Sequence, residues 1–227
     1  MSSAVTVSGL PADRRFEFIR QAYTHVIGAI GGFAFLSWLL FQSGVGEEFY
    51  WIIDENRWAW LLVLGAFSIF GWMTSHLAEA ETREMQYIGL ALAAVAEALI
   101  FSPLIYGVYE NSGVEAIYGA AMGTVALCMA ITVVVGASKH DFSYIGGILK
   151  ICSIVALAFI VASIVFGFSL GLLFSYVMLT FAGACVVYDT SRILNEHSED
   201  NYVAAALELF SSMALLFWYM LQVFNDE

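Results

Sequence analysis

Long apolar stretches dominate the chain, and its charged residues fall between them. A hydrocarbon core about 30 Å thick needs about 20 apolar helical residues to cross it. Seven stretches reach that length, at residues 22–41, 58–78, 86–106, 117–135, 144–166, 170–188 and 204–224. The alternation of polar and apolar residues that is typical of outer-membrane strands is absent. The pattern predicts an all-α, polytopic membrane protein whose single transmembrane domain covers residues 1–227. The least defined boundary is near Phe166–Leu170, where a tight turn or a bent, re-entrant segment would fit.

Composition excludes several other classes of protein. Hydrophobic residues make up 61% of the chain and charged residues 12%, whereas a soluble domain has about 25% charged residues. The net charge of −12 would repel the phosphates of a nucleic acid. The three cysteines lie inside apolar stretches without metal-ligand spacing, so we expect core residues there and no bound cofactor. The lipid bilayer is the expected environment.

Basic residues predict the orientation of the chain. With the N-terminus in the cytoplasm, seven of the eight Lys and Arg residues lie at cytoplasmic ends, and only Arg57 lies outside. Positive residues resist translocation, so this orientation is favoured. Seven spans then place the C-terminus outside.

Two pairs of glycines have the spacing of close helix contacts. They are Gly28 with Gly32 in the first span and Gly119 with Gly123 in the fourth. Such spacing lets helix backbones approach each other in a membrane. Packing within the bundle is favoured over a dimer interface.

Glu97 is the most deeply placed acidic residue. It lies about eleven residues into the third span, hence about 16 Å deep at 1.5 Å per residue. An ionisable residue at this depth is costly and must face the interior of the bundle, where it is protonated, hydrated or paired. By depth alone, His25 and Lys150 are candidate partners. Glu97 is therefore either a satisfied structural acid or part of an ion or proton path.

Asp189 and Glu208 flank the short loop between the last two spans. Asp189 could simply pair with Arg192, and Glu208 lies only about 6 Å from the edge of its span and could extend toward water. Together their oxygens could bind a hard cation at the cytoplasmic mouth.

The sequence gives little support for an enzyme. The HExxH zinc motif does not occur, and the GxSxG pattern occurs at GFSLG, residues 167–171, between two apolar stretches and without the strand–turn–helix context of a nucleophile motif. Tyr188-Asp189 matches half of an intramembrane aspartyl protease motif, but the second aspartate of such an enzyme is missing. We therefore expect no enzyme, with an intramembrane hydrolase as the weakest alternative.

Four segments together resemble the Bax inhibitor-1 family. They are EALIFSP at 97–103, DFSYIGG at 141–147, VYDTSRIL at 187–194 and, after a short acidic loop, ALELF at 206–210. The resemblance implies a seven-helix bundle in which six spans surround the last. It also implies a pH-sensitive calcium leak channel in a bacterial inner membrane. A non-conducting regulator that binds a membrane protease is the alternative, because one bacterial branch of the family acts in that way.

The resemblance also assigns roles to individual residues. In the family's pH sensor, an aspartate of the tyrosine–aspartate motif shares a proton with an aspartate in the last span. Asp189 matches the first position, but Ser212 occupies the second and cannot titrate. We hypothesise that Glu208, one turn from Ser212 on the same face, replaces the missing carboxylate. Arg83 matches a family arginine that holds the aspartate.

Overall fold

The computed structural model describes residues 6–56, 58–80, 82–138 and 140–225, and in these ranges the chain is helical with no β-strand. Arg57 and Lys139, on which part of the predicted orientation rests, lie outside the described residues. Six described helices are long and apolar enough to cross a membrane. They are α1 (Ala12–Gln42), α3 (Ala59–Ala78), α4 (Arg83–Ala137), α5 (Gly146–Phe166), α6 (Gly171–Asn195) and α7 (Tyr202–Asn225). The prediction of an all-α membrane protein is confirmed.

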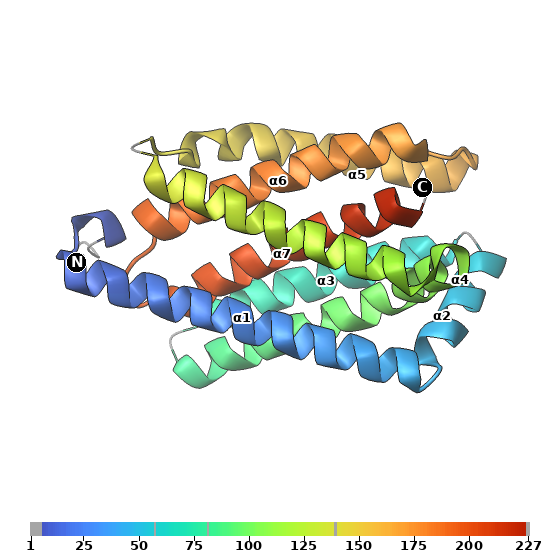
Figure 1. The fold of residues 1–227 in the computed structure, drawn as a ribbon, viewed down its shortest axis with the longest axis horizontal. Coiled ribbons are helices and arrows are strands. Elements are labelled where there is room, and N and C mark those ends of the chain that lie inside the picture. The colour runs from blue at the N-terminus through green and yellow to red at the C-terminus, as the bar shows by residue number, and fades with distance from the viewer. Residues whose placement is uncertain (1–5, 57, 81, 139, 226–227) are drawn as a thin grey trace.

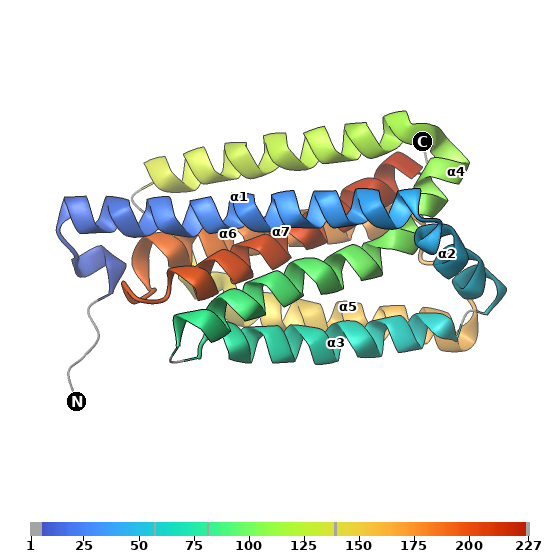
Figure 2. The same ribbon diagram turned by 90° about the horizontal axis from the view of Figure 1, so that it is seen from below.

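Helix α4 consists of two arms. Its 55 residues would extend about 80 Å at 1.5 Å per residue, far beyond the thickness of a bilayer. Gly113 interrupts the helix with φ 80° and ψ 178°, a backbone conformation that glycine adopts readily because it has no Cβ. Beyond Gly113 the chain doubles back, as the two green arms in Figure 2 show. The stretches 86–106 and 117–135 fall on these two arms.

The remaining elements are short. A helix that the apolar pattern did not predict, α2 (Val45–Glu55), follows α1. Two short 3₁₀ helices, η1 (Val7–Gly9) and η2 (Ser143–Ile145), precede α1 and α5. Residues 167–170 connect α5 to α6, beginning with Gly167 at φ 75°, so this boundary is a turn between two complete helices.

Helix α7 packs against α1, α3, α4 and α6. Its buried side chains include Leu209, Leu216 and Leu221, which are at most 1% exposed. Helix α5 lies at the outside of the bundle against α3 and α6 (Figure 1), and of its residues only Gly146 is buried. Burial of apolar side chains between α7 and its neighbours is thus the main packing contribution within the described bundle.

The second glycine pair, in the second arm of α4, makes the predicted close contact. A Cβ on Gly119 would lie 2.5 Å from the ring of Phe224 of α7, and one on Gly123 would lie 3.3 Å from Met220. At Gly28 and Gly32 of α1 a Cβ would meet no atom within 4 Å. Of the two predicted pairs, therefore, only the α4 pair lies at a close helix contact.

The bundle has two distinct ends. The α6–α7 end holds the loop of residues 196–201, the start of α1 and the connection between α4 and α5. The α2 end holds α2, the bend at Gly113 and the end of α7 (Figures 1 and 2).

Candidate functional site

Glu97 lines a partly open cavity between helices. The cavity has a volume of about 260 Å³ and lies between α3, the first arm of α4 and α7, with Phe70, Thr74 and Ser211 among its lining residues. Glu97 is 7% exposed. Its carboxyl group forms no hydrogen bond or ion pair with any described residue.

A buried carboxyl group without a partner is costly, so it needs a proton, water or a cation beside it. Because one water molecule takes about 30 Å³ in the liquid, a cavity of this size holds several. Of the other lining residues, Thr74, Ser75 and Ser211 carry hydroxyl groups, and most of the rest are apolar.

The two basic residues expected near Glu97 lie elsewhere. The Nδ1 atom of His25 lies 2.7 Å from the carbonyl oxygen of Gln21, and the ring stacks on Tyr87 with centroids 5.4 Å apart. No ion pair joins Lys150 to Glu97 among the described residues. Depth along a helix does not determine which face a side chain occupies, and the bundle turns these residues away from Glu97.

Asp189 and Ser212 are in direct contact. The hydroxyl of Ser212 in α7 donates a hydrogen bond of 2.5 Å to Oδ2 of Asp189 in α6. Asp189 is 7% exposed. The structure thus brings together the two positions that the family resemblance pairs, with a hydroxyl where the second carboxylate would stand.

Glu208 pairs with Arg192 and His197 and not with Asp189. Its Oε2 atom accepts a hydrogen bond from Nη1 of Arg192 at 2.7 Å and lies 3.2 Å from Nε2 of His197. Arg192 also reaches Glu196, at 3.2 Å. Among the described residues, therefore, Arg192 pairs with Glu208 and Glu196, and no hydrogen bond joins Glu208 to Asp189.

His197 is a residue of this cluster that the sequence did not indicate. It lies in the loop before α7 and is 7% exposed. Its ring also stacks on Phe18 of α1, with centroids 6.5 Å apart. No helical spacing relates His197 to Glu208, because a loop separates them, so the pattern of the chain gave no signal for this contact.

The side chain of Arg83, the first residue of α4, contacts the α6–α7 loop. It donates hydrogen bonds to the carbonyl oxygen of Asp200 and, at 3.1 Å, to its Oδ1 atom. Its guanidinium group lies 4.5 Å from the centroid of the Tyr202 ring. Arg83 therefore fixes the start of α4 to the loop and forms no described contact with Asp189.

Asp141 ties the connection between α4 and α5 to α6. Its Oδ1 accepts hydrogen bonds from the hydroxyl and backbone N–H of Ser143, at 2.6 and 2.9 Å, and from the hydroxyl of Ser191 at 2.9 Å. These hydrogen bonds, those from Ser143 above all, lower the pKa of Asp141 because they favour the ionised carboxylate. Ser191 in turn accepts the N–H of Phe142 at 2.8 Å. The DFSYIGG and VYDTSRIL segments thus meet in space.

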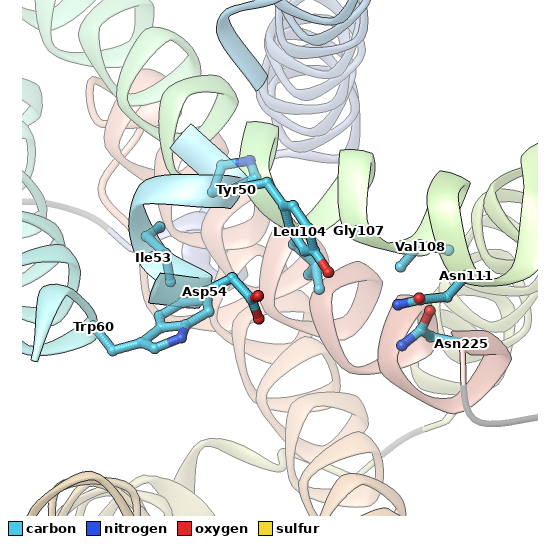
Figure 3. Close-up of a pocket in the computed structure, with 10 residues that line it drawn as sticks. Tyr50, Ile53, Asp54, Trp60, Leu104, Gly107, Val108, Asn111 and Asn225 are labelled. Atoms are coloured by element: carbon cyan, nitrogen blue, oxygen red, sulfur yellow. The ribbon is translucent and has the colours of Figure 1, made fainter. Parts of the chain in front are cut away.

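A second cavity, of about 150 Å³, lies at the α2 end (Figure 3). Tyr50, Asp54 and Asn225 bring polar groups to it. Leu104 lines this cavity and Ile100 lines the Glu97 cavity, one helical turn apart on α4. The two cavities therefore lie along the same arm of α4.

An aromatic cluster joins α4 to α7, and its α4 member, Phe101, lies between residues that line the two cavities. Phe101 is 2% exposed, stacks on Phe217 with centroids 5.7 Å apart and meets Trp218 edge-on at 5.0 Å. The edge-to-face geometry is favourable for aromatic pairs. This cluster fills the bundle at that level.

The described acidic residues provide oxygen ligands without forming a dense metal cluster. No group of three or more described His, Cys, Asp and Glu side chains has the arrangement of a metal site. Asp189 and Glu208, the predicted cation ligands, instead hydrogen-bond to neighbouring protein groups. A cation at either carboxylate would have to displace those partners.

A family model described as inhibitor of apoptosis-promoting Bax1 matches residues 15–227, nearly the whole chain. A search of curated proteins found no match. The apolar helices indicate a multi-pass membrane protein in a lipid environment. The chain belongs to the Bax inhibitor-1 family.

Proposed function

We propose that the protein is a leak channel for cations, calcium in particular, in a bacterial inner membrane. The two arms of α4 count as separate spans, so the chain crosses the membrane seven times around α7. The N-terminus and the α6–α7 end face the cytoplasm, and the α2 end and C-terminus face outward. The observation that carries the proposal is Glu97, a buried carboxyl group that has no partner among the described residues and lies beside a cavity of about 260 Å³.

The proposed path follows α7 from the α2 end. Cations enter at the cavity beside Asp54 and reach Glu97 when the aromatic cluster around Phe101 moves apart. Ser211 lines the Glu97 cavity, and the adjacent Ser212 contacts Asp189. Oxygen atoms thus follow one another along the path, as a hard cation requires. Because the aromatic side chains pack together, the structure corresponds to a closed state in this proposal.

We assign pH sensing to two groups at the α6–α7 end. Protonation of Asp189 removes the charge that accepts the Ser212 hydrogen bond, and protonation of Glu208 breaks its ion pair with Arg192. Glu208 acts through Arg192 and His197 in this scheme, rather than by direct contact with Asp189. If Asp189→Asn and Glu208→Gln each leave the pH dependence of flux unchanged, this assignment is wrong.

Calcium uptake into vesicles tests the proposed function. The purified protein is reconstituted into vesicles loaded with a calcium-sensitive dye, and uptake is compared with that of protein-free vesicles. Glu97→Gln keeps the shape of the side chain, and we expect it to reduce uptake at least tenfold. Glu110→Gln is the matched control, because Glu110 lies on the same arm of α4 but is exposed. Uptake by Glu97→Gln equal to that of the wild type would contradict the proposal.

The same experiment addresses a regulatory role. If folded wild-type protein takes up no calcium and a membrane protease copurifies with it, the protein is a non-conducting regulator.

A further inference from the structure

The chain segment before and at the start of α1 is fastened to the α6–α7 loop. We call residues 6–14 the N-terminal strap. The N–H of Val7 donates a hydrogen bond to the carbonyl oxygen of His197 at 2.9 Å, and Thr6 forms an antiparallel bridge with Ser198. The hydroxyl of Ser8 donates to the carbonyl oxygen of Asn195, also at 2.9 Å. Segments nearly two hundred residues apart in the sequence are thus paired through their backbones.

Val7 is the apolar anchor of the N-terminal strap. Its side chain is 0% exposed and lies in a cluster with Phe18, Ile193 and Ala205. Its neighbours Thr6 and Ser8 are exposed. One buried side chain therefore provides most of the apolar burial that holds this end of the strap.

An ion pair fastens the other end of the strap. Nη2 of Arg14 lies 2.6 Å from Oε1 of Glu199 in the loop. The side chain of Arg14 is 64% exposed, so the pair is a weak surface contact. Arg15, the next residue, forms no ion pair with a described residue.

The loop that the strap holds carries His197, whose ring lies against Glu208. The charged groups around this contact are Arg192, which pairs with Glu208, and Glu196, which pairs with Arg192. The strap holds the backbone of His197 and Ser198 directly, and so fixes the loop over the Glu208 cluster. Among the described residues, Val7 and the partly buried Leu10 provide the apolar contacts of the strap segment before α1, so residues 6–11 can detach while α1 stays folded.

We propose that the N-terminal strap closes the cytoplasmic mouth of the conduction path, and that its release lets the 196–201 loop move away from Glu208 and increases flux. The gating part of this inference rests on the proposed function. The attachment of the strap rests on the contacts described above.

The test combines calcium uptake with hydrogen exchange. Val7→Asp places a carboxylate in the apolar cluster, which it cannot occupy without a large desolvation cost. We expect faster amide exchange in residues 196–201 and an increase in uptake of at least fivefold. Arg14→Glu should raise uptake by at most about fivefold, as the loss of an exposed ion pair allows. The exchanged pair Arg14→Glu with Glu199→Arg should restore the wild-type rate, and Arg15→Glu is the control that should change nothing.

The outcomes separate the two proposals. If the wild type conducts and Val7→Asp exchanges faster but conducts equally, the strap does not gate the path, while the leak function stands. If Val7→Asp takes up calcium and the wild type does not, the strap holds the wild type closed. No uptake by the wild type or by any of the variants would overturn both proposals. The side chains of Arg14 and Glu199 are 64% and 31% exposed, and neither lies in the apolar cluster around Val7, so the Arg14 variants decide the question if Val7→Asp fails to fold.

Discussion

The hydrogen bond between Ser212 and Asp189 makes a quantitative prediction about stability. Among the described residues, Ser212 is the hydrogen-bond donor to the buried Asp189 carboxyl group. Ser212→Ala removes this donor and little volume. A hydrogen bond to a charged group contributes about 1.5–3 kcal/mol, and one between neutral groups about 0.5–1.5 kcal/mol. The size of the loss therefore also reports whether Asp189 is ionised.

Thermal unfolding in detergent measures this loss. For a chain of this size, 1 kcal/mol corresponds to a change in Tm of about 2–4 °C, so an ionised Asp189 predicts a decrease of about 3–12 °C. Ser211→Ala is the matched control, because the adjacent Ser211 lines the Glu97 cavity and forms no described hydrogen bond with Asp189. In the Asp189→Asn background, the effect of Ser212→Ala should be smaller, since no ionised acceptor remains.

Two results would refute this reasoning. The first is a Tm for Ser212→Ala that equals that of Ser211→Ala. The second is an undiminished effect of Ser212→Ala in the Asp189→Asn background, which would show that the serine acts through some other neighbour.

Three further predictions concern the connection between α4 and α5 and the topology. Asp141 has a lowered pKa, so its contribution to stability is present above the usual Asp value of about 3.9 and is lost as the pH falls through the lowered value. Asp141→Asn should therefore lower the Tm at pH 7, and the difference in Tm from the wild type should shrink at about pH 3. An equal difference in Tm at both pH values would refute a stabilising role of the ionised Asp141. Gly146→Ala should cost about 1 kcal/mol, because its Cβ would lie 2.7 Å from the Tyr188 ring and the ring would have to move. Gly147→Ala, with open space around its Cβ, should cost nothing. Equal unfolding free energies of the two variants would contradict the contact. A C-terminal alkaline phosphatase fusion should be active and a C-terminal green fluorescent protein fusion dark, and the reverse would exclude an outward C-terminus.

The apolar pattern predicted the long helices because each needs about 20 apolar residues to cross the bilayer. It missed α2, whose 11 residues are too few to give that signal. It also gave no reason for α1 to begin at Ala12 or for α6 to continue to Asn195. The first turns of α1 and the last turns of α6 lie beyond the apolar stretches. There, packing and hydrogen bonding extend the helix, and hydropathy gives no signal for it.

The candidate site was predictable where the signal was local or came from the family resemblance. Glu97 stood out because a carboxyl group at that depth is costly. The contact of Asp189 with position 212 followed from the resemblance, since the two residues lie on different helices. The surroundings of Glu97 and the partners of Arg83 were not predictable, because they depend on how the helices are rotated and on which loop covers them. The N-terminal strap pairs Val7 with His197, a contact that no periodicity encodes.

The central claim is that cations pass through the cavity beside Glu97, and block by cadmium tests it most directly. A single cysteine is introduced as Ser211→Cys after Cys128, Cys152 and Cys185 have been replaced, which leaves Glu97 intact. Ser211 lines the cavity together with Glu97, and a thiolate beside a carboxylate binds Cd²⁺ tightly. We predict that Cd²⁺ stops calcium uptake by Ser211→Cys, that a chelator restores it, and that the cysteine-free parent is unaffected. Undiminished uptake by Ser211→Cys, with its thiol shown to have bound Cd²⁺, would contradict the account.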